Sequence, residues 1–201
     1  MSRTLIVHAS RHGGTAGIAE RIGEVMRAAG VDAVVAAAAD LPDPVEFDAC
    51  LVGGGVYMGS WVKEGMEYLQ RYAPTLESMP VWLFSSGPLP GSTKEPKGAG
   101  LDPIERALGP ASGPGSGGRR KIEELVARIR PREHRVFNGV FDPADSPKVL
   151  SERVLRLLPG SRGILPPGDF RDWPGIEAWA RSIAAELARP VAVAGAGRSG
   201  S

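Results

Sequence analysis

Short apolar runs alternate along the chain with stretches of helical spacing, and this alternation constrains the fold more than any other feature. Five runs have the composition of buried strands: residues 4–10, 31–38, 47–55, 79–87 and 134–142. Between the first two, Ile18, Ile22 and Met26 recur on one helix face before Gly30. Buried strands that alternate with helices predict a mainly parallel sheet. We therefore expect an α/β fold: a doubly wound five-stranded parallel sheet, order 2-1-3-4-5, with helices on both faces.

The later helices carry start signals of their own. Ser60 is expected to cap a helix with Val62, Met66 and Leu69 on one face. Asp172 is expected to cap the last helix, with Pro174 in its first turn. Further helices are expected over 119–130 and 147–158, where apolar residues again recur at helical spacing.

The composition is that of one globular domain. The chain has 201 residues, of which 42% are hydrophobic and 23% charged. We expect a single domain over residues 1–190, with a Gly/Pro-rich insertion at about 90–118, and a disordered tail at 191–201. A formal net charge of +1 gives no reason to expect nucleic acid as a partner.

Compartment signals favour the cytoplasm. The apolar runs are too short for a signal peptide or a transmembrane segment. Cys50 is the one cysteine, so no intramolecular disulfide can form, and its apolar neighbours indicate a packed strand residue. We expect a cytoplasmic protein.

Residues 8–17, HASRHGGTAG, form a turn between the first strand and the first helix that suits an anion. Free N–H groups and the helix dipole favour negative charge there, and the glycines let the backbone approach a ligand. Ser10 and Thr15 can donate hydroxyl hydrogen bonds, and Arg11 adds positive charge. Because the Walker and dinucleotide patterns are both absent, a monophosphate is the expected ligand. A glycine turn capped by Thr15, with no ligand, is the alternative.

Two other strand ends reach the same edge of the predicted sheet. The run 47–55 continues into Tyr57, Met58 and Trp61, which can pack against a flat ring, and the run 79–87 continues into a Ser/Gly/Pro loop. A phosphate loop beside two such loops is what flavin mononucleotide (FMN) requires. Ordinary core packing is the alternative for Tyr57 and Trp61.

The motifs resemble a known family. SRHGGT at 10–15 resembles the phosphate loop of flavodoxins, and more closely the STRDGQT loop of menaquinone-dependent protoporphyrinogen IX dehydrogenases, which are flavodoxin-like. VGGGVYMGSW, PVWLFSSGPL and GDFRDWPGIEAWA also resemble flavodoxin-domain proteins of this branch, so the resemblance covers roughly residues 3–188. His12 replaces the acidic residue of that loop, and Gly14 replaces its glutamine.

The resemblance implies a flavodoxin-like fold with FMN as cofactor. The implied cofactor-binding residues form a phosphate loop and two ring-side loops: Ser10, Arg11, His12, Gly13, Gly14 and Thr15; Val56, Tyr57 and Met58; Ser86, Gly87, Pro88 and Leu89. The implied function is an oxidoreductase that transfers electrons between FMN and a small-molecule or quinone-like partner, with protoporphyrinogen oxidation as its most specific form. No catalytic residue and no metal are assigned; His12 and His134 are acid–base candidates by chemistry alone.

Two other functions stay open. One is a non-enzymatic flavodoxin-type electron carrier, although carriers of that kind are strongly acidic and this chain is nearly neutral. The other is a cofactor-free binding protein, which the substitutions at 12 and 14 keep open. The segment 146–170 carries four basic residues beside an apolar face, Lys148, Arg153, Arg156 and Arg162, and is expected to suit peripheral contact with a membrane; an amphipathic helix packed on the sheet is the alternative. Arg171 and these arginines are candidates to face porphyrin propionates. A homodimer is the default oligomer.

Overall fold

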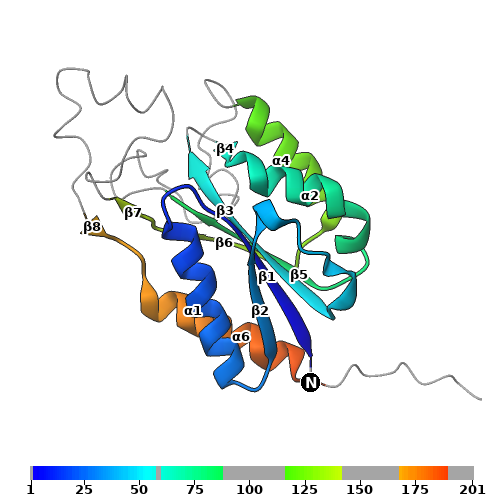
Figure 1. Ribbon diagram of the computed structural model, residues 1–201, viewed down its shortest axis with the longest axis vertical. Coiled ribbons are helices and arrows are strands. Elements are labelled where there is room, and N and C mark those ends of the chain that lie inside the picture. Colours follow the sequence, from blue (N-terminus) through cyan, green and yellow to red (C-terminus); the bar gives the residue numbers. More distant parts are fainter. Residues whose placement is uncertain (1, 58–59, 88–115, 142–167, 190–201) are drawn as a thin grey trace, which may run out of the picture.

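A sheet of parallel strands forms the centre of the protein (Figure 1). The computed structural model describes residues 2–57, 60–87, 116–141 and 168–189. Its parallel strands lie in the order β2-β1-β3-β5-β6, and β4 pairs antiparallel with the end of β3. Their bounds are β1 Arg3–Ala9, β2 Asp32–Ala37, β3 Ala49–Tyr57, β4 Ser60–Trp61, β5 Val81–Ser86 and β6 Glu133–Phe137. The predicted α/β fold is confirmed, and its strand order differs from the expected one only by the added β4.

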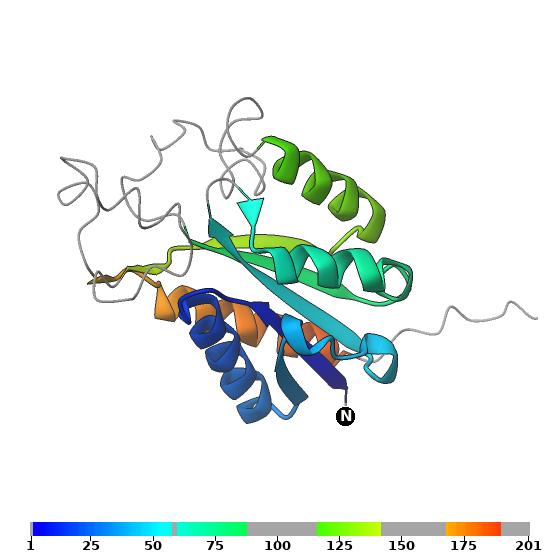
Figure 2. The same ribbon diagram turned by 45° about the horizontal axis from the view of Figure 1, so that its top comes forward.

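Helices cover both faces of this sheet, as the turned view in Figure 2 shows. Helices α1 (Gly14–Ala28) and α6 (Trp173–Leu187) pack together on one face. Helices α2 (Lys63–Leu76) and α4 (Ser116–Ile129) pack together on the other. Two short 3-10 turns, η1 (Ala38–Asp40) and η2 (Pro44–Glu46), connect β2 to β3. The structure is therefore the three-layer arrangement that alternating strands and helices predict.

Two apolar clusters, one on each face, explain the continuous apolar runs. Along β1, Leu5 and Val7 belong to the cluster under α2 and α4, whereas Ile6 belongs to the cluster under α1 and α6. Successive residues of a strand point to opposite faces of the sheet. Because both faces of this central strand are buried, consecutive positions are apolar. Trp82 is fully packed in the second cluster. Cys50 is also fully buried, which raises the pKa of its thiol to about 12, so it is a packed strand residue as expected.

Several predicted ends need correction. Ser60 lies in β4 and does not cap α2, whose N-cap is Val62. The predicted strand 134–142 divides into β6 and a two-residue strand β7 (Val140–Phe141), which pairs with β8 (Gly168–Asp169). Asp172 does cap α6, since its carboxylate accepts the N–H of Gly175 at 3.1 Å.

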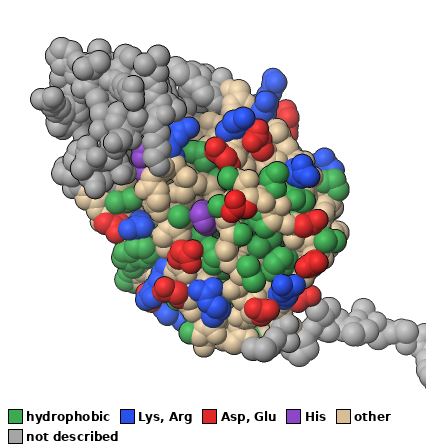
Figure 3. All heavy atoms as spheres, viewed as in Figure 1, with side chains coloured by type: hydrophobic (Ala, Val, Ile, Leu, Met, Phe, Trp, Pro, Cys, Tyr) green, Lys and Arg blue, Asp and Glu red, His purple; other side chains and the backbone are tan. Residues whose placement is uncertain are grey.

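Some predictions fall outside the described residues. They are the helix over 147–158, the basic residues from Lys148 to Arg162, nearly all of the insertion at about 90–118, the tail at 191–201, and the loop residues Met58, Pro88 and Leu89. Within the described ranges, no helix is long and apolar enough to span a membrane. The face in Figure 3 mixes basic and acidic side chains, in keeping with the near-neutral net charge.

Candidate functional site

The three predicted loops meet at the carboxyl edge of the sheet. Strand β1 ends at Ala9, which pairs in register with Gly54 of β3. Strand β5 ends at Ser86, which pairs with Gly55, and β3 continues to Tyr57. The turn at 10–15 and the segments that follow β3 and β5 therefore start side by side, which is where doubly wound sheets bind ligands.

The turn before α1 has the backbone geometry of an anion site. Gly13 has a φ of 79°, in the left-handed region, and serves as N-cap of α1 without a side-chain cap. The helix begins with the bond from the Gly17 N–H to the Gly13 carbonyl, 2.9 Å, and has no acidic residue in its first turn. The N–H groups ahead of that bond have no partner within the helix, and the dipole favours negative charge beside them.

Thr15 lies between this helix start and the sheet. Its side chain is nearly buried, at 3% exposure. A Cβ on Gly55 would lie 3.0 Å from the Thr15 hydroxyl oxygen and 3.3 Å from the Ala9 carbonyl. Glycine at 55 thus lets β3 pass close to the first turn of α1. Ser10, Arg11 and His12, which precede it, are half-buried.

The glycine run at the end of β3 makes room for two large rings. A Cβ on Gly53 would lie 2.0 Å from the ring of Phe84, and a Cβ on Gly54 would lie 2.0 Å from the ring of Trp61. Trp61 is 3% exposed and belongs to the apolar core. Of its two predicted roles, core packing is therefore the one it has. Val56 and Tyr57, beyond the run, are half-buried and lie closer to the edge of the sheet.

Trp61, Ser85 and His134 form a hydrogen-bonded chain beneath the ring-side loops. The Trp61 indole N–H donates to the Ser85 hydroxyl oxygen at 2.8 Å, and that oxygen lies 2.9 Å from His134 Nε2. The indole can only donate, so Ser85 accepts from Trp61, whereas the direction of the bond between Ser85 and His134 depends on the imidazole tautomer. The chain joins β4, β5 and β6, and it gives His134 a structural role.

The two ring-side loops also contact each other. Gly87 has a φ of 146°, and a Cβ there would lie 2.7 Å from the Val56 carbonyl oxygen. On its other side, a Cβ on Gly139 would lie 3.2 Å from the Cα of Gly87. Only glycine fits such close backbone approaches. Glycine at position 87 therefore allows the two ring-side loops to lie in contact.

Arg171 joins the C-terminal part of the chain to the helix start. Its guanidinium pairs with Asp169 at 2.7 Å and stacks over the Trp173 ring at 4.3 Å from the ring centroid. A further bond, 3.4 Å, reaches the Gly14 carbonyl across 157 residues of sequence. The bond from Arg171 lowers the pKa of the Asp169 carboxyl. This guanidinium is therefore engaged within the protein, and its contact with a porphyrin propionate stays a prediction.

Arg11 reaches from the phosphate loop to the ring-side loop. Its Cζ lies 4.6 Å from the centroid of the Tyr57 ring, the distance of a cation–π contact. The two residues belong to different predicted loops, and their contact shows how closely these loops approach.

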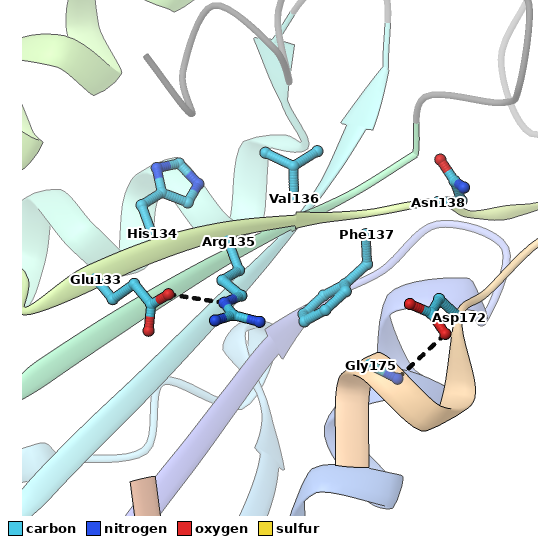
Figure 4. A pocket seen from close by; sticks show the side chains of 8 residues that line it. All are labelled: Glu133, His134, Arg135, Val136, Phe137, Asn138, Asp172 and Gly175. Carbon is cyan, nitrogen blue, oxygen red and sulfur yellow. Dashed lines mark hydrogen bonds and ion pairs between the residues drawn. The ribbon is translucent and has the colours of Figure 1, made fainter. Parts of the chain in front are cut away.

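A separate hollow of about 410 Å³ runs beside β6 (Figure 4). Its lining consists of Glu133, His134, Arg135, Val136, Phe137, Asn138, Asp172 and Gly175. The figure shows Glu133 paired with Arg135, and the Asp172 carboxylate bonded to the Gly175 N–H. No residue of the turn at 10–15 lines this hollow, so it is distinct from the loop cluster.

Comparisons with known proteins agree with the fold. A family model described as a flavodoxin domain matches residues 5–141. A cysteine-to-serine mutant of flavodoxin from Pseudomonas aeruginosa is 18% identical, with a TM-score of 0.54, and the match covers 92% of this chain and 98% of that one. A flavodoxin from Streptococcus pneumoniae is 17% identical, with a TM-score of 0.53, 92% of this chain and 99% of that one being covered.

One solved enzyme contains the same fold as a part. Rubredoxin oxygen:oxidoreductase from Desulfovibrio gigas is 11% identical, with a TM-score of 0.52, and the match covers 93% of this chain but 36% of that one. No curated protein matches the chain. At these identities the structural likenesses establish the fold.

Proposed function

The chain belongs to the flavodoxin domain family, which points to FMN as its cofactor, and on this premise we propose that it is an FMN-dependent oxidoreductase. It would transfer electrons between FMN and a small-molecule or quinone-like partner. The observation that supports the proposal most is the start of α1, which has no side-chain cap and places Gly13 at a φ of 79° beside two loops at one sheet edge.

The residues present fit the two ends of FMN. The N–H groups at the start of α1 and the hydroxyls of Ser10 and Thr15 would hold the phosphate, and no carboxylate in the first turn opposes it. Val56 and Tyr57 on one side, with Ser86 and Gly87 on the other, would hold the ring. The remaining proposed contacts, Met58, Pro88 and Leu89, lie outside the described residues.

This chain's part in the reaction is binding and orientation. When bound, FMN supplies the electron-transfer chemistry. The phosphate loop fixes one end of the cofactor, and the close approach of Gly87 to Val56 fixes the distance between the loops that hold the ring. The Trp61–Ser85–His134 chain keeps β4 in place beneath them.

A small partner is favoured over a protein partner by charge. The net charge is +1, and basic and acidic side chains are mixed on the face in Figure 3. Electron carriers that dock to proteins gain their association rates from complementary charge, which a mixed surface supplies weakly. Protoporphyrinogen oxidation is the most specific form of the proposal, and it is supported by the resemblance of SRHGGT at 10–15.

The testing experiment is anaerobic reduction of the FMN-loaded protein, followed by reoxidation with a panel of quinones, porphyrinogens and small electron-carrier proteins. We expect rapid reoxidation by a quinone-like compound with little dependence on salt. Reoxidation by carrier proteins alone, strongly slowed by salt, would identify an electron carrier instead. A colourless preparation that takes up no added FMN would leave a cofactor-free binding protein.

Other features of the proposal concern the whole protein. We propose that residues 1–190 form one domain, that the protein is cytoplasmic, and that it forms a homodimer. Peripheral contact with a membrane surface would come from the basic segment that includes Arg153 and Arg156. Size-exclusion chromatography with light scattering tests the homodimer, and vesicle sedimentation tests the membrane contact.

A further inference from the structure

The position of the Arg11 guanidinium carries an inference beyond cofactor binding. By sequence, Arg11 belongs to the loop proposed to hold the phosphate. In the structure its Cζ lies 4.6 Å from the centroid of the Tyr57 ring, at the end of β3. Tyr57 is one of the residues proposed to hold the flavin ring. The charge of Arg11 therefore lies at the ring end of the candidate site.

The described loops around this edge carry little negative charge. The segments 8–17, 54–57, 60–62, 85–87 and 138–141 contain no aspartate or glutamate. Asp169 lies in the nearby β8, but it is paired with Arg171 at 2.7 Å. Over these described segments, the formal charge is that of Arg11, and the first segment also contains His8 and His12.

We propose that Arg11 raises the reduction potential of bound FMN by acting on the flavin ring rather than on the phosphate. This inference rests on the proposed function. When two electrons and one proton from a chemical reductant are added to FMN, the ring gains one negative charge. A fixed positive charge within about 7 Å, at an effective dielectric constant of about 40, favours that product about tenfold. Stacking on Tyr57 holds the guanidinium in place for this effect.

The test compares reduction potentials of the FMN-saturated wild type, Arg11→Gln and Arg11→Lys by anaerobic titration with a reference dye. A tenfold effect is a fall of about 30 mV for a two-electron couple, and we expect this fall in Arg11→Gln. Arg11→Lys keeps the charge and should retain most of the wild-type potential. Arg181→Gln is the matched control, because Arg181 is an exposed arginine on α6 paired with Glu177, and its loss should leave the potential unchanged.

Binding of oxidised FMN and of riboflavin, measured on the same variants, separates the alternatives. If Arg11→Gln keeps the wild-type potential but weakens FMN and not riboflavin, Arg11 contacts the phosphate and the inference is overturned. An unchanged potential with unchanged affinities overturns it as well. If the wild type binds neither flavin, the proposed function itself fails, and this inference fails with it. Thermal melting of each variant confirms that the fold is intact.

Discussion

Replacing Ser85 with alanine tests the chain beneath the ring-side loops. The Ser85 side chain is fully buried, accepts from the Trp61 indole at 2.8 Å and bonds His134 Nε2 at 2.9 Å. The substitution leaves the buried Trp61 N–H without its acceptor, at a cost of about 1–3 kcal/mol, and removes a hydrogen bond to the half-buried His134, at about 0.5–1.5 kcal/mol. Trp61 is only 3% exposed, so water cannot readily replace the lost acceptor. We expect Ser85→Ala to lower the free energy of unfolding by about 2–4 kcal/mol.

Urea denaturation of the wild type, Ser85→Ala, Trp61→Phe and the double variant measures this cost. Trp61→Phe removes the indole N–H but keeps an aromatic ring. Because the bond to Ser85 is already absent in that background, Ser85→Ala should cost about 1–2 kcal/mol less there. Strictly additive losses, or a Ser85→Ala loss below about 0.5 kcal/mol, would refute the hydrogen-bonded chain.

Four further predictions concern the loops and their support. Thr15→Ala should weaken FMN binding by about 1–3 kcal/mol in isothermal titration, because a buried hydroxyl donor is lost; unchanged affinity would remove Thr15 from the site. Gly13→Val should weaken FMN more than Thr15→Ala does and lower the melting temperature, since a left-handed conformation costs a residue with a Cβ about 1–2 kcal/mol. Gly54→Ala should destabilise the protein by about 1–3 kcal/mol, because its Cβ would lie 2.0 Å from the Trp61 ring; a neutral result would contradict that packing. Burial lowers the pKa of His8, so the unfolded state binds more protons, and stability should fall as pH drops below about 6.5; in His8→Gln this fall should be smaller in denaturation curves at pH 7.5 and 5.5.

The sequence was sufficient for features that depend on burial or on local backbone chemistry. Leu5, Ile6 and Val7 lie between two apolar clusters, and only a strand covered on both faces requires such a continuous run. The turn composition indicates positive φ at Gly13 and Gly14, and Gly13 adopts it at the start of α1 whereas Gly14, already in the helix, does not. Asp172 caps α6 through a bond within one helical turn.

Features that depend on distant partners could not be predicted. Ser60 has the chemistry of a helix cap, but its backbone pairs with β3, and that tertiary pairing moves the helix start to Lys63. Ser85 and His134 are 49 residues apart, and no periodic pattern links them. The Arg171 bond to Gly14 spans 157 residues, so only the folded chain shows that this arginine is engaged within the protein.

The proposed function depends on the turn from Ser10 to Thr15 binding the phosphate of FMN. Calorimetric titration of the flavin-free protein with FMN and with riboflavin tests it most directly, because the two ligands differ only in the phosphate. We expect one FMN to bind per chain and riboflavin to bind at least about tenfold more weakly, since a single charge-assisted hydrogen bond contributes about 1.5–3 kcal/mol. Equal affinity for the two ligands, or no binding of either, would contradict it.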